Sequence, residues 1–123
     1  MARDYGNYIR IAIPEAKVKV EAVHNALVKL IQAAGGSTAV EGWGSWVDGN
    51  GGLVTEKVIQ YTWNFHSTTY IKVDMAAREL VNALFRAGEQ AVLKERYYDE
   101  SIAVHTRTLI GYAARMLYAP TKH

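Results

Sequence analysis

The stretch EGWGSWVDGNGGLVTE, residues 41–56, holds two of the three tryptophans of the chain and the turn dipeptides Asp-Gly and Asn-Gly. These dipeptides, placed between alternating apolar residues, are the strongest short-range sign of a β-hairpin. The sequence therefore predicts a tight turn at residues 48–52. Glycines also let a backbone approach a ligand that aromatic rings cover, so the hairpin is a candidate binding site as well.

Two long strands are predicted to flank this turn, one at residues 37–47 and the other at residues 53–66. Side chains alternate between the two faces of a strand. In the second strand one face carries the larger apolar side chains, namely Ile59, Tyr61, Trp63 and Phe65. A hairpin with strands of this length can project beyond its sheet as an arm.

The remaining segments show the periodicity of strands and helices. Alternating isoleucines in YIRIAI predict a strand, while apolar residues at helical spacing predict helices that end at Gly35 and Gly88. The predicted elements are a strand at 8–13, helices at 17–34 and 72–87, a strand at 90–98 and a C-terminal helix at 101–117.

The resulting order, β-α-β-β-α-β, predicts an α+β fold of the ferredoxin-like split βαβ type. In that arrangement an antiparallel sheet carries two helices on one face. The long central hairpin and the extra C-terminal helix are additions to it. The length of 123 residues predicts a single domain, with its body at about 8–98 and the C-terminal helix at about 101–117.

Composition favours a globular protein of the cytoplasm. Half of the residues are hydrophobic, 21% are charged, and there is no cysteine. No apolar run approaches the roughly 20 residues of a membrane span, and the N-terminus lacks the apolar core of a secretory signal. A net charge of +2 is too small to indicate binding to a nucleic acid duplex, but it suits a small anionic ligand.

No local motif predicts catalysis or a metal site. The four histidines lie far apart in sequence and form no ligand spacing, and no nucleophile elbow occurs. The segment GNGG lacks the strand-loop-helix context of a phosphate-binding loop, and a hairpin turn explains it. From the residues alone we therefore expect no enzyme activity, no catalytic residues, no metal and no cofactor.

The tryptophans are the first candidates for ligand binding. Trp43 and Trp46 are three residues apart, so they point to opposite faces of a strand unless Gly44 forms a bulge. Trp63 lies on the strand expected to pair with theirs. These rings could form a stacking wall for a purine, or they could pack in the core or between subunits. The pattern leaves both interpretations open.

Arginines are the second candidates. Arg107 and Arg115 are eight residues apart and would share one face of the predicted C-terminal helix, with Gly111 between them. Two guanidinium groups in this arrangement could hold a diphosphate, although a solvated helix face explains them as well. Asn82, one turn before Arg86 on the second predicted helix, is a weaker polar candidate.

A resemblance to a known family rests on two blocks, GWGSWVDGNGGLVTEKVIQY and GEQAVLKE. They are similar to small ferredoxin-like phage proteins, and among these to the Thoeris anti-defence proteins of the first type. The resemblance covers about residues 8–98 and consists of fold-like markers. It does not extend to the C-terminal segment.

The family resemblance implies a phage sponge that sequesters glycocyclic ADP-ribose, a cyclic ADP-ribose-type immune signal, and so blocks Thoeris immunity. It also implies a homo-oligomer that holds the nucleotide between subunits in the host cytoplasm. Three alternatives are weighed beside it on the residues alone. One is a ferredoxin-like regulatory module for a small molecule, and another is an adaptor that binds a host protein through its tryptophan face. The third, a dimeric ferredoxin-like enzyme such as a small oxygenase or isomerase, is disfavoured because no acid/base cluster is visible.

Overall fold

The computed structural model describes residues 5–99 and 110–120. Its elements, in chain order, are β1 (Asn7–Pro14), α1 (Glu15–Val18), α2 (Glu21–Ala34), β2 (Thr38–Val47), β3 (Leu53–Phe65), η1 (Ser67–Thr69), α3 (Tyr70–Arg86), β4 (Ala91–Asp99) and β5 (Ile110–Tyr118).

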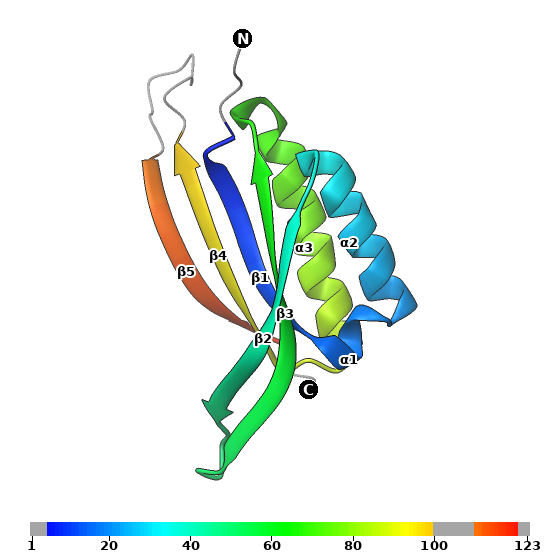
Figure 1. The fold of residues 1–123 in the computed structure, drawn as a ribbon, viewed down its shortest axis with the longest axis vertical. Helices are drawn as coiled ribbons and strands as arrows, with labels where there is room; N and C mark the ends of the chain where they lie inside the picture. The colour runs from blue at the N-terminus through cyan, green and yellow to red at the C-terminus, as the bar shows by residue number, and fades with distance from the viewer. Residues whose placement is uncertain (1–4, 100–109, 121–123) are drawn as a thin grey trace.

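The strands form one antiparallel sheet in the order β2-β3-β1-β4-β5. Helices α2 and α3 both lie on one face of the sheet, and the other face carries no described helix (Figure 1). The protein is therefore an α+β structure of two layers, with β1 at the centre of the sheet.

The core lies between the two helices and the central strands. The three isoleucines of β1, Ile9, Ile11 and Ile13, are all fully buried, which is the face that their alternation predicts. Leu30 of α2 and Leu80 of α3 are buried against the same cluster. The apolar stripes of the helices thus cover the apolar face of the sheet.

The two long helices end at glycines, as the sequence predicts. Gly35 follows α2 with φ 101°, and Gly88 follows α3 with φ 103°, a left-handed conformation that glycine adopts without steric cost. The helix expected at 17–34 differs at its start, because a separate short α1 precedes α2. The break lies at Lys19 and Val20.

The hairpin of β2 and β3 is confirmed, together with its turn. The Asp48 side chain accepts hydrogen bonds from the backbone N–H groups of Asn50 and Gly52, at 2.9 and 2.8 Å. The β2–β3 register continues without a bulge from the Thr38–Thr62 pair to the Val47–Leu53 pair. Trp43 and Trp46 therefore lie on opposite faces of β2.

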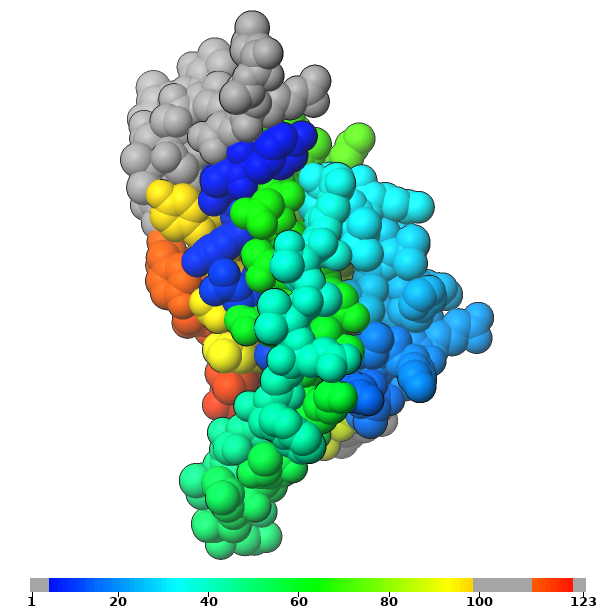
Figure 2. Space-filling view, in the orientation of Figure 1, coloured from blue at the N-terminus to red at the C-terminus, as the bar shows by residue number. Residues whose placement is uncertain are grey.

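Beyond the pairing with β1, the hairpin forms a projecting arm. β1 contacts β3 only from Val58 to Phe65, so the preceding part of β3 pairs with β2 alone. We call residues 43–57 the arm. Its base contacts the body through the Lys57–Glu15 ion pair at 3.1 Å, and its tip projects beyond the body in Figures 1 and 2. Trp43 is 72% exposed and Leu53 is 75% exposed, so the arm presents apolar side chains to solvent.

The C-terminal helix is the part of the prediction that is wrong. Residues 110–118 form strand β5, which pairs with β4 along its whole length, from Ala91–Tyr118 to Asp99–Ile110. Ala, Arg, Met and Leu favour helices locally, but as a strand the segment gains backbone pairing with β4 along its whole length and packs Leu117 against the core. Pairing with β4 outweighs the local preference. The first part of the expected helix, 101–109, lies outside the described residues.

The contrast between two tryptophans gives a stability prediction. Trp63 is fully buried and stacks on Tyr61 at 5.6 Å between ring centroids, so Trp63→Ala should lower the free energy of unfolding by about 3–5 kcal/mol. Trp43→Ala, at an exposed position, should change the free energy of unfolding of the monomer by about 0.5 kcal/mol or less. Urea unfolding measures both. Equal losses in the two variants would contradict the assigned core.

Candidate functional site

The face of the sheet opposite the helices carries a cluster of polar and aromatic side chains. Because the isoleucines of β1 point toward the helices, the residues that alternate with them, among them Tyr8 and Arg10, point to the open face. The register places Tyr8 opposite Tyr97 and Arg10 opposite Glu95 on β4, and Arg10 opposite Thr62 on β3. Three strands thus bring these groups together.

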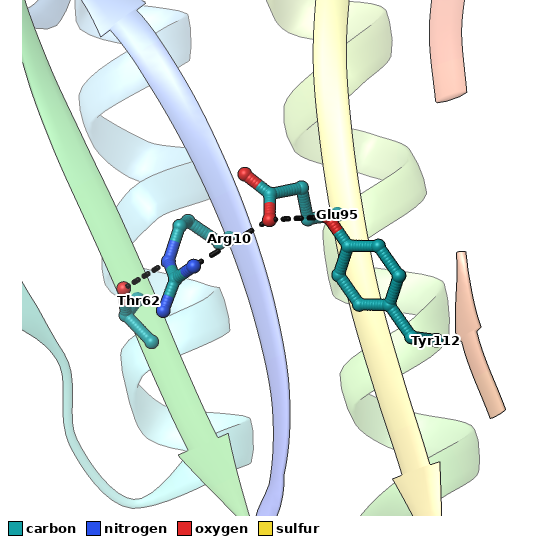
Figure 3. Close-up of polar contacts among 4 residues, drawn as sticks. All are labelled: Arg10, Thr62, Glu95 and Tyr112. Atoms are coloured by element: carbon teal, nitrogen blue, oxygen red, sulfur yellow. Dashed lines mark hydrogen bonds and ion pairs between the residues drawn. The ribbon is translucent and has the colours of Figure 1, made fainter. Parts of the chain in front are cut away.

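A chain of polar contacts runs across the strands (Figure 3). Arg10 Nε donates to Thr62 Oγ1 at 3.1 Å, and its Nη1 lies 3.5 Å from Glu95 Oε2. The Tyr112 hydroxyl of β5 donates to the same Glu95 oxygen at 2.8 Å. In Figure 3 the other carboxylate oxygen of Glu95 points away from both partners.

Aromatic rings lie on the same face of the sheet as this carboxylate. Tyr8 and Tyr97 pack edge to face with ring centroids 6.0 Å apart, and the Arg10 guanidinium carbon lies 4.7 Å from the Tyr8 ring centroid. Tyr112 is the register partner of Tyr97 on β5. We call Tyr8, Arg10, Thr62, Glu95, Tyr97 and Tyr112 the open-face cluster.

The electrostatics of the cluster centre on Glu95, whose negative charge is partly offset by the Arg10 guanidinium 3.5 Å away. The hydrogen bond to Glu95 raises the pKa of the Tyr112 phenol above its ordinary value, and desolvation and the Glu95 charge act in the same direction. Tyr112 therefore stays protonated at neutral pH and holds Glu95 in place. A carboxylate beside aromatic rings can receive a cation, to which an open ring face contributes roughly 0.5–2 kcal/mol, but the Tyr8 ring already lies against the Arg10 guanidinium. The same carboxylate can accept a proton.

A cavity of about 490 Å³ lies on the helix side of the sheet, between α3 and the β4–β5 edge. Its cationic lining residues are Arg78, Lys94, Arg96 and Arg115. Asn82 of α3 lies in the same lining. Two candidates that are distant in sequence, Asn82 and Arg115, are thus brought together.

The other predicted site residues are dispersed. Trp43 and Trp46 lie on the arm, on opposite faces, and are 72% and 43% exposed. Trp63 is a core residue that no solvent reaches. Arg107 lies outside the described residues.

Sequence reasoning missed the open-face cluster, although part of its signal was present. The alternation in YIRIAI places Tyr8 and Arg10 on one face, and in LKERYY it places Glu95 and Tyr97 on one face. If the first strand is paired with the fourth, as in a split βαβ sheet, Tyr8 and Arg10 lie beside Glu95 and Tyr97 on one face. Tyr112 could not be found in this way, because its segment was expected to be helical.

Two other kinds of site have no candidate in the described part of the chain. None of its helices has the length and apolar character to cross a bilayer. Within residues 5–99 and 110–120, no three His, Cys, Asp or Glu residues gather closely enough to hold a metal ion.

Comparison with known proteins identifies structures of similar fold. No protein-family model matches the sequence, and no curated protein matches it. The structure is similar to that of a phage SAM lyase in complex with S-methyl-5′-thioadenosine, with a TM-score of 0.57 and 15% identity over 97% of this chain and 95% of that one. A phage SAM lyase in the apo state gives a TM-score of 0.58 and 16% identity over 100% and 98% of the two chains. At these identities the likeness shows a shared fold.

This finding overturns the expectation that the protein is not an enzyme. The two structures of similar fold described above are of a phage SAM lyase, so the lack of a local motif did not exclude catalysis. Catalytic groups need only meet in space. In the open-face cluster, residues as far apart as Arg10 and Tyr112 contact the same carboxylate. A scan for short motifs cannot detect such a site.

Proposed function

We propose that the protein is a lyase that acts on a sulfonium nucleoside of the S-adenosylmethionine (SAM) type, with the open-face cluster as its site. The observation that carries the proposal is the Glu95 carboxylate, held between Arg10 and Tyr112 on the face that also carries the packed Tyr8 and Tyr97 rings. The shared fold with a phage SAM lyase supports it.

The chemistry of such a ligand matches the cluster. SAM carries a sulfonium, and breaking a carbon–sulfur bond returns the bonding pair to sulfur, which leaves as a neutral thioether such as S-methyl-5′-thioadenosine. The remaining four-carbon fragment then loses a proton or is captured by its own carboxylate. We assign Glu95 to the positive charge of the substrate, and to the proton if one is lost. The rings of Tyr8 and Tyr97 supply surfaces for the adenine and the sulfonium.

We further propose that the fold is the ferredoxin-like split βαβ arrangement. The order β4-β1-β3-β2 of the first four strands, with α2 and α3 on one face, supports this arrangement, and β5 adds an edge strand to it. SAM is a metabolite of the cytoplasm, and we propose that the protein acts there.

We also propose a homo-oligomer, because an open site on one sheet face needs a cover to exclude water.

A second candidate function is favoured by one observation, that Asn82 and Arg115 line the same cavity. It is the sequestration of a cyclic ADP-ribose-type nucleotide, as the resemblance to the Thoeris anti-defence proteins implies. The cationic lining suits the diphosphate of such a ligand, and the exposed Trp43 of the arm offers a stacking surface for adenine.

The lyase proposal is tested by incubating the purified protein with SAM and measuring S-methyl-5′-thioadenosine by liquid chromatography and mass spectrometry. The wild type should form this product. Glu95→Gln removes the charge at nearly constant volume and should lower the rate about 10²- to 10⁴-fold. As a control, Glu79→Gln on the helix layer should keep the wild-type rate. A wild type without turnover, or a fully active Glu95→Gln, would refute the proposal.

The second candidate is tested by calorimetric titration with glycocyclic ADP-ribose. Arg115→Ala should weaken binding about ten- to hundredfold, since one charge-assisted hydrogen bond contributes roughly 1.5–3 kcal/mol. The Glu95→Gln variant should bind the nucleotide like the wild type. Absence of heat at high ligand concentration would remove this candidate and leave the lyase proposal intact.

The oligomer is tested by light scattering, which should report a multiple of 13.7 kDa. If the arm makes the subunit contact, Leu53→Lys should lower the measured mass, because it places a charge on an apolar contact. Ile71 of α3 is similarly exposed, at 69%, so Ile71→Lys is the matched control and should leave the mass unchanged. A monomeric wild type, or dissociation caused by Ile71→Lys alone, would speak against the arm.

A further inference from the structure

The cavity beside α3 lies on the opposite face of the sheet from the open-face cluster. β4 supplies both, because its side chains alternate: Lys94 and Arg96 line the cavity, whereas Glu95 lies in the cluster. β5 lies at the edge of the sheet, beyond the helix layer (Figure 1). This overhang leaves the hollow of about 490 Å³, a volume typical of a small-molecule site.

The cavity concentrates positive charge. Lys94 and Arg115 are direct register partners on β4 and β5, and like charges directly opposite each other destabilise a sheet. Arg96 is two residues along on the same face of β4. The lining contains one carboxylate, Asp74, which already pairs with Arg78 at 3.1 Å. Three cations therefore face the cavity with little compensation from its own lining.

The titration of Lys94 agrees with this geometry. Burial lowers the pKa of the Lys94 ammonium group, and the charges of Arg96, Arg78 and Arg115 lower it further, while Asp74 acts in the opposite direction. An anion in the cavity would offset both the desolvation and the repulsion between the cations.

The rest of the lining suits a flat ring. Phe85 and Val81 of α3 and Leu117 of β5 form apolar walls, to which Phe85 contributes an aromatic ring. Aromatic side chains stack on nucleobases with a contribution of roughly 1–3 kcal/mol per base. The Asn82 amide adds a donor and an acceptor that can orient a polar ring edge or a ribose.

We infer that this cavity is a binding site for a nucleoside phosphate, with the phosphate groups on Lys94, Arg96 and Arg115 and the base against Phe85 and Leu117. The inference goes beyond the lyase proposal, since it concerns the other face of the sheet. It holds for linear nucleotides and does not require the cyclic nucleotide of the second candidate. A nucleotide bound there would contact β4 on either side of Glu95.

The test is calorimetric titration with ADP, adenosine and pyrophosphate. ADP should bind the wild type in the submillimolar range, more tightly than adenosine, and more weakly as salt is added. Lys94→Ala and Arg115→Ala should each weaken ADP binding about ten- to hundredfold. Arg115 is exposed, so its variant should fold normally, which thermal melting will verify.

Two controls locate the site. Arg86→Ala removes the same charge from α3 outside the cavity lining and should leave ADP affinity within about twofold, as expected for an exposed cation without a ligand contact. Glu95→Gln should also keep ADP affinity, whatever it does to turnover of SAM.

Four results would overturn the inference. They are no binding of ADP or pyrophosphate at millimolar concentration, unchanged affinity in both cavity variants, adenosine binding as tightly as ADP, and a short oligonucleotide binding far more tightly than ADP. The last result would identify the cavity as part of a nucleic acid surface. Each of these results leaves the lyase assay untouched, because that assay depends on the other face.

Discussion

The burial of Ile9, Ile11 and Ile13 beneath the two helices is the constraint on which the rest of the molecule depends. β1 is the central strand and pairs with both β3 and β4. A shift of one residue would move the isoleucines to solvent, so hydrophobic burial sets the register of three strands at once. The same alternation directs Tyr8 and Arg10 to the open face. The core and the candidate site therefore have one physical origin.

The side chains of β4 alternate between the two faces of the sheet in the same way, next to the edge strand β5. Lys94 and Arg96 point to the cavity beside α3, whereas Glu95 and Tyr97 point to the open face. β5 completes both places, because it adds Arg115 to the cavity and Tyr112 to the cluster. Neither place would have its full set of charges or donors if the chain ended at β4.

The absence of a catalytic motif was a poor guide to function for a reason that the sheet makes clear. Groups on adjacent antiparallel strands meet in space while they lie far apart in sequence. Arg10 and Glu95 are direct register partners, yet 85 positions separate them. The tryptophans, which are conspicuous in the sequence, have three separate environments: two faces of the arm and the core.

Local chemistry determined the parts of this protein that depend on neighbours in the chain. Short segments of the sequence are enough to predict four features. These are the turn at Asp48, the alternation of β1 and β3, the amphipathic stripes of α2 and α3, and the glycines that end these helices. Tertiary structure decided the rest. Residues 110–118 contain good helix formers but pair with β4, because this pairing and the packing of Leu117 against the core outweigh helix propensity. The chain of contacts from Thr62 through Arg10 and Glu95 to Tyr112 likewise depends on tertiary structure, because it requires β1 to pair with β3 and β4, and β4 to pair with β5. Burial across the whole sheet selects these strand partners, and adjacent residues in the sequence do not.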